Sequence, residues 1–262
     1  MRGLELVHLA LSRLGSSRLR AALTMLGVII GVASVVSLVA VGQGATSGVT
    51  KQLQGLGTNL LTVNPGATTT GFTRGAAGSA NTLTVADAQA IAALPGVAAV
   101  EPESSTSQFV VAGSQNTTTT IVGTTAAYTT IRNYDIWQGS TLNGASVDGH
   151  LNEAVLGATT ADDLGLTASS IGSTITIGGL PFRVVGILQA KGSTGPVSQD
   201  DEILVPYTVV EAQFVPGSNV RTIGISVVSA DQIDSVKGEI TGLLETRHDI
   251  AIGGTDDFTI AD

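Results

Sequence analysis

The sequence predicts an α+β fold: one N-terminal transmembrane helix followed by an extracytoplasmic domain, in which an α/β subdomain is interrupted by a β-rich insert. Three observations predict it: a long uncharged run near the N-terminus, basic residues before that run, and strand–helix–strand patterns at both ends of the remaining chain. A net charge of −9 disfavours a nucleic-acid partner. The 262 residues contain no cysteine, which excludes disulfides, thiolate metal sites and cysteine nucleophiles within them.

The 22 residues from Ala21 to Gly42 carry no charged side chain. A helix of that length spans about 33 Å, and the hydrocarbon core of a membrane is about 30 Å thick. Residues 21–42 are therefore predicted to form a transmembrane helix. The alternatives are a cleaved signal peptide, whose apolar region is shorter, and a buried core helix, which seldom runs so long without charge.

The charges that flank this helix predict its orientation. Residues 1–20 hold four arginines and one glutamate, a net charge of +3, so the rest of the chain carries −12. Because cytoplasmic flanks of membrane helices are enriched in Lys and Arg, the N-terminus is predicted to be cytoplasmic and the main domain extracytoplasmic. The predicted location is the cytoplasmic (inner) membrane.

Two features predict contacts within the membrane region. Residues 1–20 have an apolar periodicity that suits an amphipathic cytoplasmic or interfacial helix, although a cytoplasmic extension of the membrane helix would give the same pattern. The apolar positions are Leu4, Val7, Leu11 and Leu14. Within the span, Gly27 and Gly31 form a GxxxG motif, whose small residues let a second helix approach closely.

Residues 58–122 predict the first half of the α/β subdomain. Thr84 followed three residues later by Asp87 indicates a helix N-terminus, and the Pro-Gly pair at 95–96 ends that helix. Ala67–Ala80 is rich in Gly, Thr, Ser and Ala and is predicted to be a loop. The strand candidates are Leu60–Val63, Val97–Val100, Phe109–Val111 and Thr117–Val122, the last two joined by a turn.

Residues 207–262 repeat the strand–helix–strand order. Ala230–His248 predicts a helix capped near Asp231. The strand candidates are Val220–Val228 and either Ile250–Ile252 or Phe258–Ile260. Two such units on either side of a middle section indicate one subdomain with an insertion.

That middle section, residues 123–206, alternates short apolar strands with turns and predicts the β-rich insert. Ile175–Ile177 and Phe182–Leu188 flank a Gly-Gly pair, which favours a two-residue hairpin turn. Ala158–Leu166 predicts a short helix. Trp137 is predicted to anchor the core of the insert.

No catalytic, cofactor or metal constellation is expected. Gly42–Gly48 has the wrong spacing for a dinucleotide loop, and no GxxxxGKS/T motif occurs. The pair His248–Asp249 has no nucleophile motif beside it, so a surface or helix-end role is favoured. The remaining acidic groups are predicted to be turns or helix caps rather than cation sites. They are Asp162–Asp163, Asp200–Glu202 and Asp256–Asp257.

Several segments resemble one family in serial order. The first, Arg18–Gly66, reads RLRAALTMLGVIIGVASVVSLVAVGQGATSGVTKQLQGLGTNLLTVNPG. The later ones are LTVADAQAIAALPGVAAVEP, YTTIRNYDIWQGS, AVLGATTADDLG, IGSTITIGGLPFRVVGIL, DDEILVP and TRHDIAIGGTDDFTI. Together they resemble the N-terminal helix and extracytoplasmic domain of MacB-type ABC transporter permeases.

The resemblance implies a porter-like α/β subdomain with an inserted Sabre-like β-rich subdomain. It implies a stalk over residues 43–57, including Gln43, Gly44 and Gly57, that transmits motion. The implied partners are a separate cytoplasmic ABC ATPase, a second permease in a homodimer or heterodimer, membrane lipid, and an extracytoplasmic adaptor or cargo. The implied function is export of drugs, peptides or lipid-linked cargo driven by ATP hydrolysis, with no enzyme activity in this chain.

The family's second, third and fourth membrane helices have no counterpart before Asp262. The chain is therefore expected to be either the N-terminal part of a permease or a one-span relative. In the second case it would be a membrane-tethered binding or regulatory module that acts on cell-wall enzymes or envelope proteins.

Overall fold

The computed structural model describes residues 22–39, 59–70, 73–77, 80–192, 198–217, 219–251 and 253–262. The chain divides into two units, Met1–Gln54 and Gly55–Asp262. In the first unit Ala22–Val39 form one helix with exposed side chains. It is the one helix among the described residues that is long and apolar enough to cross a membrane.

Gly27 and Gly31 lie on this helix, and nothing lies within 4 Å of the Cβ position of either. Packing of a second helix against them stays a prediction. The predicted helix over residues 1–20 and the stalk residues Gln43, Gly44 and Gly57 lie outside the described residues.

The second unit contains a four-stranded antiparallel sheet, here called sheet I, in the order β12-β1-β11-β4. Its strands are β1 (Leu60–Pro65), β11 (Thr222–Val227), β12 (Phe258–Ala261) and residues 97–103 of β4 (Val97–Ala112). Helix α3 (Val85–Ala92) connects β1 to β4, and α8 (Ile233–Arg247) connects β11 to β12. Each connection skips one strand, so two split βαβ units interlock. The repeated strand–helix–strand order predicted from the sequence is confirmed.

Local sequence accounts for both helices. The capping box at Thr84 is confirmed, because Asp87 N donates to its hydroxyl at 3.2 Å while its own N–H donates to the Asp87 carboxylate at 2.8 Å. A 3-10 turn, Ala230–Gln232, precedes α8, and the N-cap residue Gln232 makes no side-chain cap bond. The helix start predicted near Asp231 lies within one residue of the observed N-cap, but no side-chain hydrogen bond caps it. Val236, Ile240 and Leu244 recur at spacing four and bury one face of α8 against sheet I.

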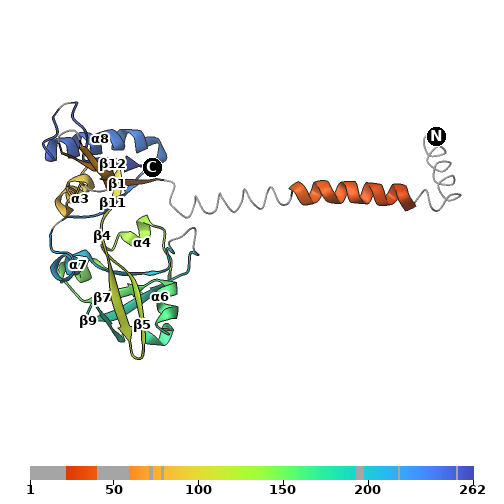
Figure 1. Ribbon diagram of the computed structural model, residues 1–262, viewed down its shortest axis with the longest axis horizontal. Coiled ribbons are helices and arrows are strands. Elements are labelled where there is room, and N and C mark those ends of the chain that lie inside the picture. The colour runs from red at the N-terminus through yellow and green to blue at the C-terminus, as the bar shows by residue number, and fades with distance from the viewer. Residues whose placement is uncertain are drawn as a thin grey trace. The chain divides into compact units, whose positions relative to one another are not determined.

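Strand β4 is longer than predicted. The sequence suggests separate strands at 97–100 and 109–111, but the structure has one strand of 16 residues (Figure 1). Its first part pairs with β11 up to Glu103, and from Ser104 onward it pairs with β5 (Gln115–Thr124). The polar stretch between the two predicted strands misled the sequence prediction, because β4 passes from one sheet to another there.

The second sheet, here called sheet II, follows the order β4-β5-β10-β7-β9-β6, with β8 pairing with β4 and β9. The additional strands are β6 (Ile136–Gly139), β7 (Glu153–Leu156), β8 (Thr174–Ile177), β9 (Leu180–Leu188) and β10 (Glu202–Pro206). The predicted hairpin across Gly178 and Gly179 is confirmed as β8–β9. Both glycines have positive φ, which the tight turn requires.

The helices between β5 and β11 are α4 (Tyr128–Ile131), α5 (Gly144–Asp148), α6 (Ala158–Asp163) and α7 (Tyr207–Gln213), with a 3-10 turn at Ala168–Ser170. Two apolar clusters pack against sheet II: one contains residues of α6 and α7, and the other contains Tyr128 of α4. The short helix predicted at 158–166 is confirmed as α6. Helix α7 and all but the last two residues of β5 lie outside residues 123–206, yet both elements share the core of sheet II. The subdomain limits themselves stay predictions.

Two further sequence predictions are settled by the strands. Phe258–Ile260, not Ile250–Ile252, supplies the returning strand, as β12. The loop predicted over 67–80 is wrong in part, because β2 (Ala67–Thr70) and β3 (Thr73–Ala77) pair as a two-stranded sheet. Thr-rich segments fit a strand as well as a loop, which explains the error.

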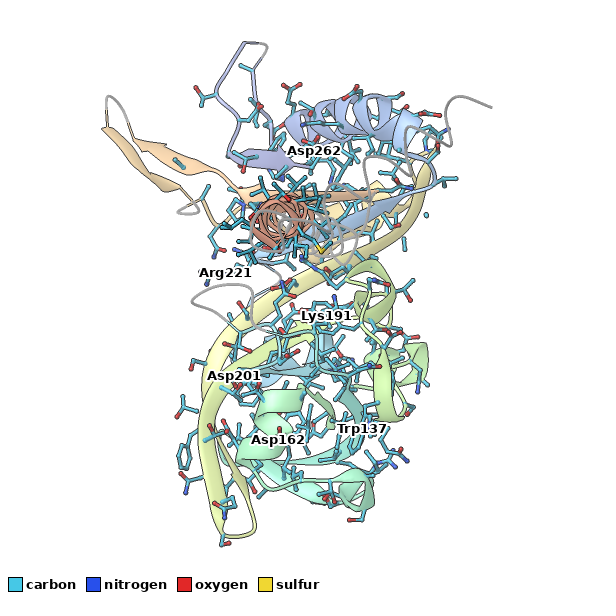
Figure 2. The ribbon with its side chains drawn as sticks, turned by 90° about the vertical axis from the view of Figure 1, so that its right-hand side faces the viewer. Trp137, Asp162, Lys191, Asp201, Arg221 and Asp262 are labelled. Atoms are coloured by element: carbon cyan, nitrogen blue, oxygen red, sulfur yellow. The ribbon has the colours of Figure 1, made fainter. Side chains whose placement is uncertain are left out.

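Trp137 does not anchor a core. It is the extra residue of a β-bulge in the edge strand β6, where the register shifts between Ile136 and Gln138, and it is 55% exposed (Figure 2). A bulge turns a side chain away from the face that alternation would give it.

The exposure of Trp137 has a measurable consequence: we expect red-shifted tryptophan fluorescence that acrylamide quenches nearly as well as it quenches a free indole. Trp137 is the one tryptophan of these 262 residues, so any tryptophan elsewhere in the full protein is first replaced. Blue-shifted emission that acrylamide quenches poorly would contradict this placement.

Candidate functional site: a cavity between the two sheets

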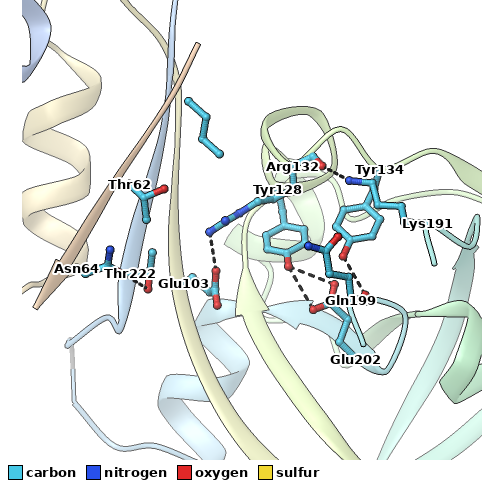
Figure 3. A pocket seen from close by; sticks show the side chains of 11 residues that line it. Thr62, Asn64, Glu103, Tyr128, Arg132, Tyr134, Lys191, Gln199, Glu202 and Thr222 are labelled. Carbon is cyan, nitrogen blue, oxygen red and sulfur yellow. Dashed lines mark hydrogen bonds and ion pairs between the residues drawn. The ribbon is translucent and has the colours of Figure 1, made fainter. Parts of the chain in front are cut away.

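A cavity of about 320 Å³ lies between sheet I and the segments that follow α4 (Figure 3). Strand alternation explains its wall on the sheet I side. Leu61 and Val63 point into the core beneath α3 and α8, so Thr62 and Asn64 point to the opposite face. The charged lining residues are Glu103, Arg132, Lys191 and Glu202.

Arg132, just after α4, joins the two sheets. Its Nε donates to Glu101 Oε1 at 2.8 Å, and its Nη2 donates to Glu103 Oε2 at 3.0 Å. Both glutamates belong to the part of β4 that pairs with β11, and their spacing of two places them on one face. Because α4 packs on sheet II through Tyr128, the guanidinium connects sheet II to two carboxylates of sheet I. These three residues are here called the Arg132 clamp.

Glu101 is the buried member of the clamp. Its side chain is 0% exposed, and Oε2 accepts a hydrogen bond from Thr124 Oγ1 at 3.0 Å. Burial raises the pKa of Glu101 to about 7, against the opposing charge of Arg132 and with the added repulsion of Glu103.

Gly224 provides the space for this carboxylate. It lies directly opposite Glu101 on β11, and a Cβ atom there would come within 2.4 Å of Glu101 Oε1. Position 224 therefore requires glycine as long as the Glu101 side chain points across β11.

Two stacked tyrosines form the opposite wall. The rings of Tyr128 and Tyr134 are 5.8 Å apart, and Lys191 Nζ lies 4.1 Å from the centre of the Tyr134 ring. Tyr128 donates its hydroxyl to Glu202 at 3.2 Å, and Tyr134 donates its hydroxyl to the carbonyl of Gln199 at 2.9 Å. Burial raises the pKa of Glu202 to about 7, although the nearby phenols of Tyr134 and Tyr128 act against it.

Lys191 also reaches the clamp, because its Nζ donates to the backbone carbonyl of Arg132. Burial lowers the pKa of Lys191, although Glu202 and Asp200 act in the opposite direction. The ammonium group of Lys191 thus contacts both the Tyr134 ring and the backbone of Arg132.

The acidic run at 200–202 binds protein donors. Asp200 accepts hydrogen bonds from the backbone N–H groups of Lys191 and Gly192 at 2.9 and 2.8 Å. Asp201 accepts one from the Thr119 hydroxyl at 2.7 Å. Among the residues that the structure describes, no group of three or more histidine and acidic side chains could hold a metal ion.

His248 has the predicted helix-end position, immediately after α8. Its Nδ1 lies 2.8 Å from the Asp257 carboxylate and its Nε2 lies 3.4 Å from Asp87, so its partners are not its neighbour Asp249. Burial lowers the pKa of His248, but the hydrogen bonds to Asp257 and Asp87 outweigh it and the net direction is upward. These contacts tie the C-terminal end of α8 to α3 through Asp87 and to the segment before β12 through Asp257.

Sequence reasoning missed the clamp and Gly224. Two glutamates at spacing two on a strand are an ordinary solvent-exposed pattern, and an arginine about thirty residues later carries no signal of contact. The weak signal was the glycine in the middle of a predicted strand, because such a glycine often marks a close approach.

The family described as MacB-like periplasmic core domain matches residues 21–243, which include both the apolar helix and most of the two-sheet domain. The chain belongs to this family. Relatives named "Macrolide export ATP-binding/permease protein MacB" are 36% identical over 98% of this chain in Azoarcus sp. and 37% identical over 93% of it in Rhodospirillum rubrum. The chain spans 38% and 37% of the length of those relatives.

Solved structures support the same fold for this MacB-like domain. The periplasmic region of MacB from Actinobacillus actinomycetemcomitans superposes with a TM-score of 0.68 at 23% identity, over 80% of this chain and 91% of that one. The extracellular domain of the noncanonic ABC-type transporter YknZ from Gram-positive bacteria gives 0.62 at 20% identity, over 78% of this chain and 100% of that one. The α+β class and the resemblance to MacB-type permeases are confirmed.

Proposed function

We propose that this chain is the first membrane helix and extracytoplasmic domain of an ABC transporter permease subunit. In this proposal ATP hydrolysis on the cytoplasmic side moves the extracytoplasmic domain and thereby drives export of drugs, peptides or lipid-linked cargo. The observation that carries the proposal is the family match over residues 21–243, because it joins the apolar helix and the two-sheet domain in one unit. The name of the relatives, which combines ATP binding with a permease, supports it.

The moving parts are the two sheets. Strand β1 follows residues 43–57, the proposed stalk, while sheet II is joined to sheet I through the continuous strand β4 and the Arg132 clamp. A displacement of the stalk is thus delivered first to sheet I and then, through the clamp, to sheet II. Gly27 and Gly31 would pack against another membrane helix of the same or a partner permease.

ATP hydrolysis is assigned to a cytoplasmic ABC ATPase outside these residues, acting on a homodimer or heterodimer of permeases, with an extracytoplasmic adaptor or the cargo at the domain. The full protein purified from membranes should contain or retain ATPase activity, whereas residues 1–262 alone should hydrolyse no ATP. A full protein that neither contains nor binds an ATPase would contradict the transport proposal. The tethered regulatory module would then be the better account.

The orientation proposed for the helix places the N-terminus in the cytoplasm. Because the 262 residues lack cysteine, single cysteines at Ser12 and Thr118 give a direct test with a membrane-impermeant thiol reagent. We expect Thr118→Cys to react in intact cells or spheroplasts and Ser12→Cys to react only after the membrane is opened. Reaction of both from the same side would contradict the orientation.

A further inference from the structure

A second groove, of about 450 Å³, lies beside β4 where the strand passes between the sheets. It forms because β11 does not continue along β4. The last bond to β4 is from the Arg221 N–H to the carbonyl of Glu103, at 2.7 Å. The two residues before Arg221 pair elsewhere: the Val220 N–H donates to Leu83, and Asn219 forms a β-bridge with Thr84. The chain therefore turns away from Ser105. The space that this turn vacates is the groove.

The edge of β4 along this groove is open. Pairing with β11 ends at Glu103 and pairing with β8 starts at Val110. On the same edge Glu103 and Phe109 accept bonds from Arg221 and Gly178. By the alternation of an antiparallel ladder, Ser105 and Ser107 direct their N–H and C=O groups to that edge too, away from β5. Among the described residues no strand pairs with them.

The charge of the groove is distinct from that of the domain. Arg221 is the one ionised side chain that lines it, beside Asn, Ser and Thr residues, and no acidic side chain within the described residues forms an ion pair with it. Figure 2 shows Arg221 beside the long β4 ribbon. A guanidinium without an acidic partner, next to unpaired strand hydrogen-bonding groups, suits a carboxylate carried by an extended chain.

We propose that this groove binds an extended, acidic polypeptide segment of a partner protein by β-strand addition to Ser105–Ser107, with a carboxylate of that segment on Arg221. The open stretch from Ser104 to Gln108 has a length of about 17 Å and accommodates a short strand. Backbone pairing supplies the general affinity, and the contact with Arg221 selects an acidic side chain or chain terminus. The proposal does not depend on the transport activity.

The test uses the full protein in lipid nanodiscs and a dye-labelled hexapeptide of alternating valine and threonine with one glutamate. A matched peptide carries glutamine at that position. We expect the glutamate peptide to bind about tenfold more tightly, as a charge-assisted bond predicts, and Arg221→Gln to abolish that preference. Ser105→Pro should abolish binding of both peptides, since it removes the N–H that faces the groove and leaves the β5 side intact.

Lys237→Gln is the control, because it removes an exposed cation elsewhere on the domain and should leave both affinities unchanged. Arg221 is exposed, so its substitution keeps the test valid even if Ser105→Pro fails to fold. Absence of binding, equal affinity for both peptides, or unchanged preference in Arg221→Gln would each overturn the proposal. Acetate that competes as well as the peptide would also overturn it, because the groove would then bind a small anion.

Discussion

Arg132→Met should lower the free energy of unfolding of the domain by about 3 kcal/mol at pH 8, because it leaves Glu101 buried without its cationic partner. The loss should be smaller at pH 5. Burial already raises the pKa of Glu101 to about 7, and removal of Arg132 raises it further. At pH 5 the carboxyl is therefore protonated in the variant and its buried charge disappears.

The sign of the pH dependence follows from the same shift. A carboxyl whose pKa is higher in the folded state binds its proton more tightly there, so its contribution to stability is complete below about pH 4.5 and is lost as the pH rises through 7. Glu202 acts in the same direction.

Urea unfolding at pH 5 and pH 8 measures the difference in the free energy of unfolding between Arg132→Met and the unchanged protein. Lys237→Met, which removes an exposed ion pair, is the control and should cost at most about 0.5 kcal/mol at either pH. An equal loss for Arg132→Met at both pH values would contradict the assignment.

Gly224→Ala should destabilise the domain by about 2–3 kcal/mol. The new methyl group would lie 2.4 Å from Glu101 Oε1, 2.9 Å from its Cγ and 3.0 Å from its Cδ. The glutamate cannot swing away at low cost, because Arg132 and Thr124 hold both of its oxygens.

Gly238→Ala is the matched control for this substitution. Gly238 lies on the exposed face of α8 with nothing within 4 Å of its Cβ position, so alanine there should stabilise the domain by about 0.5–1 kcal/mol. The double variant Gly224→Ala with Glu101→Ala should recover part of the loss, since truncation of the glutamate makes room for the methyl group. Two losses that simply add would show that the methyl group does not meet Glu101.

The sequence predicted the elements whose signals are local. Thr84 and Asp87 specify a capping box within four residues, the Gly178-Gly179 turn specifies a hairpin, and the uncharged run specifies the apolar helix. The ordered family resemblance then gave the fold class before any contact was known.

The candidate site was beyond the sequence because its contacts are long-range. Arg132 meets Glu101 and Glu103 across about thirty residues, and Gly224 lies opposite Glu101 across more than a hundred. Such contacts depend on strand order and on the passage of β4 between the sheets, and neither leaves a local pattern. The prediction that Trp137 anchors a core was wrong for a related reason. A single β-bulge in β6, which the sequence does not reveal, turns this side chain toward solvent.

The central claim is that nucleotide-driven motion in the membrane region changes the relation between sheet I and sheet II. It is tested most directly by the distance between spin labels at Val228→Cys, next to β11, and Phe109→Cys, on the sheet II part of β4. Both positions are exposed, and the 262 residues contain no other cysteine. In the full protein with its ATPase, the distance distribution should shift between the nucleotide-free and ATP-bound states, and Arg132→Met should reduce the shift. Identical distributions in the two states, with ATP hydrolysis verified in the same sample, would contradict the account.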